Sequence, residues 1–297
     1  MIRSIKATAV AALCCGLAGA GLVGCEDITD PKPRPAVGAS ARDGLITGTQ
    51  KIQAGGYAVN VSCTGGGEDG EPVVVLMPGA GDGLDTMAGL QKKLSEKARV
   101  CSYDRPGEGK SDKPDGRQRM EDAEKVLTEV LDRTAGDGPV VLAAHSLGGL
   151  IAARYAPDHQ DRVKGLVLLD ATIPELTAGV SKVIPETAEG PGAELRAQTL
   201  AMNQGENPEK LVVDDEKVRP AGDIPVEILR HEHQFDSVPE YGPGLEDMWA
   251  DGQKQWRALS DRSTLSMAER SGHHIHVDRP DLAQAAVERV VAEAAGE

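Results

Sequence analysis

A serine lies at the junction of two apolar segments of different character. Residues 139–143 (PVVLA) form a continuous apolar run of the kind found in a strand buried on both faces, and residues 147–156 (LGGLIAARYA) have the composition of a helix. Between them, residues 144–148 (AHSLG) place small residues two positions before and two after Ser146. A sharp strand-to-helix turn needs small residues there because its backbones approach closely, and it lifts the serine hydroxyl out of the sheet. The pattern predicts a nucleophile; the alternative is a serine that caps a helix.

A carboxylate and an imidazole occur at positions that could activate this serine. Asp170 ends the apolar run 163–169, so we expect it at the same edge of a parallel sheet as Ser146. His273 and His274 follow the expected strand 263–268. Serine, histidine and a carboxylate together can carry out acyl transfer, because the imidazole takes the serine proton and the carboxylate orients the imidazole.

The elements that must position these residues alternate along the chain. Short β-branched runs alternate with helical stretches, which predicts a mostly parallel sheet covered by helices on both faces. Residues 172–222 interrupt this alternation, because they are polar, rich in Pro and Gly and only weakly helical. The expected strands are 47–54, 57–63, 72–77, 99–103, 139–143, 163–169, 224–229 and 263–268, and the expected helices are 84–97, 119–133, 147–156, 244–259 and 280–294.

Three further segments carry a resemblance to the α/β-hydrolase superfamily. Residues 78–81 (PGAG) stand where the family usually has His-Gly-x-Gly, and residues 103–112 (YDRPGEGKSD) resemble its YDRxGxGxSD turn. Residues 271–274 (SGHH) resemble the family's Gly-His ending after the last strand. The resemblance extends over residues 46–297. It implies the α/β-hydrolase fold, a mostly parallel central sheet with helices on both faces and a small lid insertion at about 172–222.

The resemblance also assigns roles to individual residues. The backbone N–H groups of Ala80 and Leu147 would form the oxyanion hole. His273 rather than His274 would be the base, because Gly272-His273 leads to Arg279-Pro280 in the family's register.

The triad acid has more than one candidate. A subgroup with the same YDR turn and SGH ending uses the earlier position, which favours Asp170. Many relatives place the acid after the following strand, where Asp236 and Glu232 are the alternatives.

These features predict a serine hydrolase that cleaves an ester-like bond of a small acyl substrate through an acyl-enzyme intermediate. The alternative is a catalytically inactive, lipid-anchored binding protein on a hydrolase scaffold. No cofactor is expected. The His-x-His pairs at 231–233 and 274–276 lack supporting Cys or carboxylate spacing, so they are interpreted as surface or loop histidines and no metal site is predicted.

The N-terminus has the pattern of an export signal. Residues 1–24 carry two basic residues and then an apolar, glycine-rich run that ends in Leu-Val-Gly before Cys25. This ending resembles the bacterial lipobox and implies a lipid anchor at Cys25. Residues 25–45 are expected to form a flexible tether. The predicted location is therefore outside the cell, attached by lipid to the outer face of the bacterial membrane.

Composition bears on partners and on the cysteines. The formal charge of −15 argues against a nucleic-acid partner, since phosphate binding needs clustered Lys and Arg. Of the five cysteines, Cys63 and Cys101 are the pair left in an oxidising compartment after removal of the signal and lipidation. In the family's sheet order their strands are neighbours, which predicts a disulfide, provided that the register places both sulfurs on one face.

Overall fold

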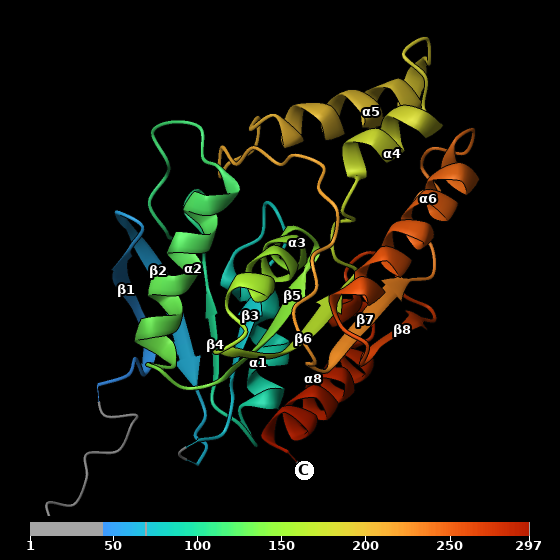
Figure 1. The fold of residues 1–297 in the computed structure, drawn as a ribbon. Helices are drawn as coiled ribbons and strands as arrows, with labels where there is room; N and C mark the ends of the chain where they lie inside the picture. Colours follow the sequence, from blue (N-terminus) through green and yellow to red (C-terminus); the bar gives the residue numbers. More distant parts are fainter. Residues whose placement is uncertain (1–43, 69, 297) are drawn as a thin grey trace, which may run out of the picture. The chain divides into compact units, whose positions relative to one another are not determined.

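The parallel part of the sheet lies at the centre of the fold (Figure 1). The computed structural model describes residues 44–68 and 70–296, so the predicted signal and Cys25 lie outside the described residues. Eight strands are ordered β1-β2-β4-β3-β5-β6-β7-β8. Their bounds are β1 Gly48–Ala54, β2 Tyr57–Thr64, β3 Val73–Met77, β4 Val100–Tyr103, β5 Val140–His145, β6 Val163–Leu169, β7 Val226–His231 and β8 Ser263–Ala268.

Strand direction follows from the connections. β1 and β2 form the predicted antiparallel hairpin, and β2 pairs antiparallel with β4. From β4 to β8 every pair is parallel, because helices connect these strands. β3 and β5 are fully buried, in agreement with their continuous apolar sequences. The predicted fold class, an α/β-hydrolase fold with a mostly parallel sheet, is confirmed.

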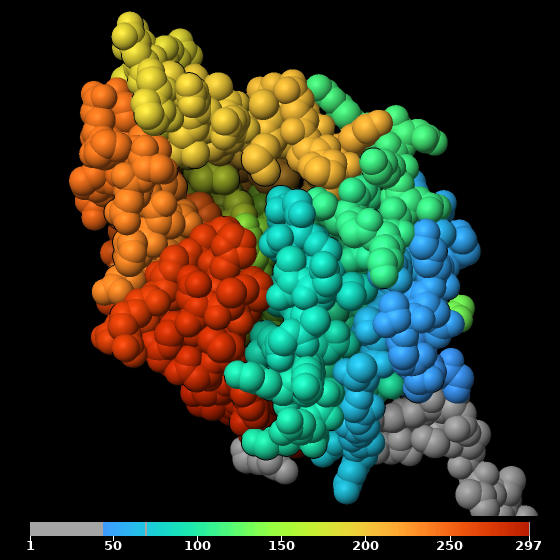
Figure 2. All heavy atoms as spheres, turned by 180° about the vertical axis from the view of Figure 1, so that it is seen from behind, coloured from blue at the N-terminus to red at the C-terminus, as the bar shows by residue number. Residues whose placement is uncertain are grey.

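Helices cover both faces of the sheet with two separate apolar cores. Side chains of α2 and α3 pack on one face and those of α1 and α8 on the other, and Figure 2 shows α8 in red on the second face. No helix among the described residues is both long and apolar enough to cross a membrane. The helices are α1 Ala88–Leu94, α2 Met120–Thr134, α3 Ser146–Tyr155, α4 Leu176–Val183, α5 Gly190–Asn203, α6 Gly242–Gln255, α7 Ile275–Asp278 and α8 Pro280–Ala295.

Residues 172–222 contain two helices, although the sequence suggested only weak helicity. α4 follows the carboxyl end of β6 and packs against α6, and α5 packs against α4 (Figure 1). Val180 and Ile184 are buried against Leu245 of α6 in a small third apolar cluster. Tertiary packing therefore stabilises α4, whose eight residues would form a marginal helix on their own.

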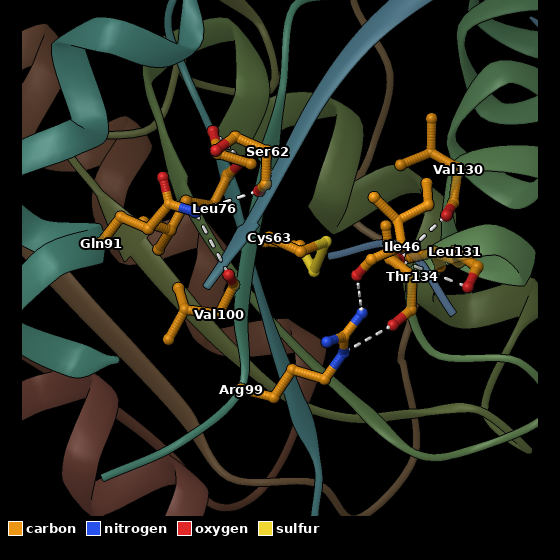
Figure 3. Close-up of a disulfide and its surroundings, with 12 residues drawn as sticks. Ile46, Ser62, Cys63, Leu76, Gln91, Arg99, Val100, Val130, Leu131 and Thr134 are labelled. Carbon is orange, nitrogen blue, oxygen red and sulfur yellow. Dashed lines mark hydrogen bonds between the residues drawn. A yellow bond between two sulfur atoms is a disulfide. The ribbon is translucent and has the colours of Figure 1, made fainter. Parts of the chain in front are cut away.

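The predicted disulfide joins Cys63 of β2 to Cys101 of β4 (Figure 3). The two residues are direct partners in the antiparallel pair, with Cα atoms 4.1 Å apart. The register therefore places both sulfurs on one face, as the prediction required. Nearby, Arg99 donates to the backbone carbonyls of Ile46 and Thr134, which connects the start of β4 to the segment before β1 and to the end of α2.

Replacing both cysteines in the Cys63→Ala/Cys101→Ala variant should lower the free energy of unfolding by about 4 kcal/mol. This is the chain-entropy estimate for a closed loop of 38 residues. Denaturant unfolding of both proteins, with and without dithiothreitol, measures the loss. Reduction should lower the midpoint of the wild type and leave that of the variant unchanged. Alkylation of Cys63 and Cys101 in the unreduced wild type would contradict the disulfide.

Candidate active site

Ser146 occupies a strained backbone position between β5 and α3. Its φ of 50° lies in the left-handed region, which costs a non-glycine residue about 1–3 kcal/mol. A Cβ on Gly148 would lie 2.5 Å and 2.6 Å from the carbonyl oxygens of Pro78 and Met77, so glycine is required there. The Thr172 N–H donates to the Ser146 carbonyl at 3.0 Å, and the hydroxyls of the two residues are 3.5 Å apart. The predicted tight turn is thus present.

Asp170 has the same kind of backbone strain at the end of β6, with a φ of 49°. Its fully buried carboxylate accepts four hydrogen bonds. His273 Nδ1 and His231 Nδ1 donate to Oδ2 at 2.6 Å and 2.7 Å, while Trp249 Nε1 and the His231 backbone N–H donate to Oδ1 at 2.9 Å and 3.1 Å. Burial alone would raise the pKa of Asp170, but the hydrogen bonds from the two histidines outweigh it and lower the pKa well below its usual range.

His273 lies in the loop between β8 and α7. Because Nδ1 donates to Asp170, the neutral ring has its lone pair on Nε2, the nitrogen that can take a proton. His145 Nε2 lies 3.0 Å from the His273 backbone carbonyl and donates to it. His145 immediately precedes Ser146, so this bond holds the loop of His273 beside the serine turn.

The structure separates the candidates that the sequence left open. Asp170 bonds to His273. The side chain of Asp236 is exposed, and its Oδ2 lies 3.8 Å from His233 Nε2. Glu232 accepts the Arg270 backbone N–H at 2.6 Å. His274, the alternative base, has Nε2 4.0 Å from Asp82 and a half-exposed side chain. The geometry thus unites Asp170 with His273 and places the alternatives in other contacts.

The two predicted oxyanion-hole residues, Leu147 and Ala80, lie at the start of α3 and in the loop after β3. Leu147 is in the first turn of α3, where backbone N–H groups have no acceptor within the helix. Ala80 belongs to the loop 78–81 that follows β3. In this loop the Pro78 and Gly79 carbonyls accept hydrogen bonds from Arg105 at 2.6 Å and 2.7 Å. Arg105 therefore holds the loop 78–81 through two of its backbone carbonyls.

Arg105 also joins this loop to the inserted segment. It forms a bidentate ion pair with Glu209, with both N–O distances at 2.8 Å and both side chains buried. Glu108 Oε1 accepts the Gly81 N–H at 2.7 Å. Burial and the negative charge of Glu209 raise the pKa of Glu108 to about 7, although the Gly81 hydrogen bond opposes the shift.

Three residues near Asp170 were missed by the sequence interpretation. His231, taken as a loop or surface histidine, is the buried last residue of β7 and bonds to Asp170. Its Nε2 bonds to Glu246 of α6 at 2.8 Å, and Trp249 of the same helix also donates to Asp170. One feature of the sequence could have pointed to His231, namely its position at the end of a parallel strand. The carboxyl ends of parallel strands meet where ligands bind in such sheets.

His276 also differs from the surface interpretation. It is buried in α7, and its ring lies 4.8 Å from that of His145 between centroids. Burial and the neighbouring His274 and His273 lower the pKa of His276 to about 4, so its imidazole is neutral at pH 7.

Asp170, His231 and His273 have the residue types of a metal site, and their ligand atoms lie within 4.8 Å of one another. The N–O distances of 2.6 Å and 2.7 Å are those of direct hydrogen bonds. Two ligand atoms at about 2.1 Å from one tetrahedral zinc ion would lie about 3.4 Å apart. The observed geometry therefore fits shared protons better than a shared ion.

The fold and this site place the chain among proteins with the α/β-hydrolase fold. Residues 72–201 match the family described as alpha/beta hydrolase fold. Among solved structures, carboxylesterase CesB from Bacillus subtilis superposes with a TM-score of 0.58 at 15% identity, covering 84% of this chain and 93% of that one. The enol-lactonase from Burkholderia xenovorans LB400 gives a TM-score of 0.59 at 17% identity, covering 82% and 100%.

Curated relatives are similar over shorter stretches. An uncharacterized protein of Schizosaccharomyces pombe is 41% identical over 26% of this chain but only 15% of its own length. The uncharacterized protein YqjL of Bacillus subtilis is 23% identical over 72% of this chain and 81% of its own length. The human (lyso)-N-acylphosphatidylethanolamine lipase is 31% identical over 33% of this chain and 29% of its own length. The chain thus spans 15% of the length of the first of these relatives and 29% of the length of the last.

The Glu108→Gln variant should gain stability over the wild type as the pH rises. The folded protein keeps a proton on Glu108 up to about pH 7, whereas the unfolded chain releases it near pH 4.5. The wild type therefore loses stability across this range, and the neutral glutamine, which keeps the acceptor for Gly81, does not. The expected gain is near zero at pH 4.5 and about 1–2 kcal/mol at pH 8.

Calorimetric melting at several pH values measures this difference. Glu96→Gln, at an exposed position on the surface, is the matched control and should show a difference from the wild type that is independent of pH. A Glu108→Gln difference that is equally independent of pH would contradict the raised pKa.

Proposed function

We propose that the protein is a serine hydrolase that cleaves an ester-like acyl bond in a small-molecule substrate. The observation that carries the proposal is the 2.6 Å hydrogen bond between His273 and buried Asp170, at the sheet edge where Ser146 stands on its strained turn. A histidine held in the Nδ1–H tautomer, in a loop that is bonded to the residue before Ser146, supports a role in nucleophilic catalysis.

The proposed reaction has two halves. The Ser146 Oγ attacks the substrate carbonyl while His273 Nε2 takes the hydroxyl proton, and Asp170 stabilises the imidazolium that results. The N–H groups of Ala80 and Leu147 donate to the oxyanion. Collapse of the intermediate passes the proton from His273 to the leaving alcohol. Water then attacks the acyl-serine, again with His273 as base, and releases the carboxylic acid and Ser146.

Esterases and lipases among similar proteins support the choice of ester-like bonds. The structural neighbours include the carboxylesterase and the enol-lactonase described above, and one relative that matches over 33% of this chain is a lipase. We assign substrate selection to residues 172–222. Glu209 in this segment bonds to Arg105, which holds the loop 78–81 beside the site.

Ser146→Ala should lower kcat for ester hydrolysis by about 10³-fold or more and abolish labelling by a fluorophosphonate probe, because the hydroxyl is the reacting group. Asp170→Asn should also cause a large loss of kcat, since asparagine cannot stabilise the imidazolium. Ester turnover, probe labelling and the melting temperature of each variant are the measurements.

Asp236→Asn is the matched control, because it makes the same chemical change at an exposed carboxylate and should keep activity near that of the wild type. A wild-type protein that takes up no probe would favour an inactive binding protein. A larger loss from Asp236→Asn than from Asp170→Asn would move the acid to the later position.

We further propose that the chain is exported and anchored by lipid at Cys25, on the strength of residues 1–25 and of the disulfide, a bond typical of oxidising compartments. A diacylglycerol group supplies at least two acyl chains, enough for stable anchoring. Cys25→Ala should therefore move the protein from the membrane fraction to the soluble fraction in cell fractionation. Membrane association of the variant equal to that of the wild type would refute lipidation.

A further inference from the structure

His231 is a buried imidazole that the proposed reaction leaves unused. Its side chain is 1% exposed, and each ring nitrogen faces a different carboxylate. Nδ1 lies 2.7 Å from Asp170 Oδ2, and Nε2 lies 2.8 Å from Glu246 Oε2. An ionised carboxylate can only accept hydrogen bonds, so both nitrogens must donate, and an imidazole with two N–H groups carries a positive charge.

The surroundings of the two carboxylates support this charge. Burial would raise the pKa of Glu246, but the backbone N–H groups of Gln234 and Phe235 and the His231 ring outweigh it and lower the pKa. Burial would likewise lower the pKa of His231, yet the hydrogen bonds and charges of Asp170 and Glu246 outweigh it and raise the pKa.

His231 and His273 share one acceptor atom. Both donate to Asp170 Oδ2, and one ring nitrogen of each lies within 4.8 Å of the other. A fixed positive charge at this distance opposes a second positive charge on His273.

We propose that His231 is a positioning residue of the candidate active site, a permanently protonated imidazole that acts through Asp170. It holds the carboxylate toward His273 and sets the lowest pH at which His273 can still serve as a base. Glu246 balances its charge, so that Glu246, His231 and Asp170 together carry a net charge of −1, which protonation of His273 neutralises. This inference rests on the proposed hydrolase function.

Few groups that contact His231 could change the pH at which His273 takes up a proton. Asp170 faces it from β6, Glu246 from α6 and His273 from the loop after β8, while Arg230 donates to its backbone carbonyl at 3.0 Å. The remaining ring neighbours, Phe235 and Trp249, carry no charge.

The test compares two substitutions that should shift the pH dependence in opposite directions. In His231→Asn the amide nitrogen can take the place of Nδ1, so the donor to Asp170 is kept and the charge is lost. The labelling rate with a fluorophosphonate falls at low pH, where His273 is protonated and cannot serve as a base, and this fall is called the acid limb. In His231→Asn the acid limb should move to higher pH by about one unit, because His273 accepts a proton more readily. Glu246→Gln removes a negative charge and should move the acid limb to lower pH.

His233→Asn is the matched control, since the same substitution is made two residues away at a half-exposed side chain. Its acid limb should coincide with that of the wild type. A purely structural role for His231 would lower the melting temperature or kcat without displacing the limb. If His231→Asn does not fold, the protonation of the His231 ring in the wild type, measured by nitrogen NMR, decides the proposal.

Nitrogen NMR of 15N-histidine-labelled full-length protein provides a readout that does not require activity. His231 should show two protonated ring nitrogens at pH 7, and the titration midpoint of His273 should move in the variants as the acid limb does. A wild type that takes up no probe defeats the hydrolase function, and the NMR comparison still tests His231. A neutral His231 at pH 7, or shifts that are absent or of the same sign in the two variants, would overturn the proposal.

Discussion

The organisation of the site depends on the hydrogen bonds that the buried Asp170 carboxylate accepts. A buried, isolated charge would be strongly unfavourable, so its cost has to be offset by donors that surround it. Here the donors come from the end of β7, from α6 and from the loop after β8. One carboxylate therefore fixes three elements relative to β6, and its removal would leave several buried N–H groups without an acceptor.

Backbone strain accompanies this arrangement. Ser146 and Asp170 both have positive φ at the ends of neighbouring parallel strands, β5 and β6. Thr172, just after the second strained residue, donates its N–H to the carbonyl of the first. The two strained turns thus support each other, and the strain is concentrated where the side chains leave the sheet together.

A second buried ion pair connects the inserted segment to the core. Arg105 contacts two carbonyls of the loop 78–81 and pairs with Glu209 from residues 172–222. Removal of one partner alone would leave an unpaired buried charge, which is far more costly than the pair itself. Arg105 therefore connects this segment to the loop 78–81.

The sequence by itself determined the elements and the local turns. Continuous apolar runs predicted the buried strands, and the small residues around Ser146 predicted the tight turn, because these properties follow from neighbours in the chain. It also predicted the pairing of Cys63 with Cys101 once the strand order was assumed, although the register that makes them direct partners was an open question.

Only the tertiary structure decided how residues distant in sequence share charge. The approach of His231 to Asp170 depends on the pairing of β6 with β7, and that of Glu246 on the packing of α6 across their ends. Likewise, Glu209 meets Arg105 over a separation of 104 residues. A single histidine or glutamate has the same local pattern whether it is exposed or buried. Its burial and its partner, which together set its protonation, are properties of the assembled fold.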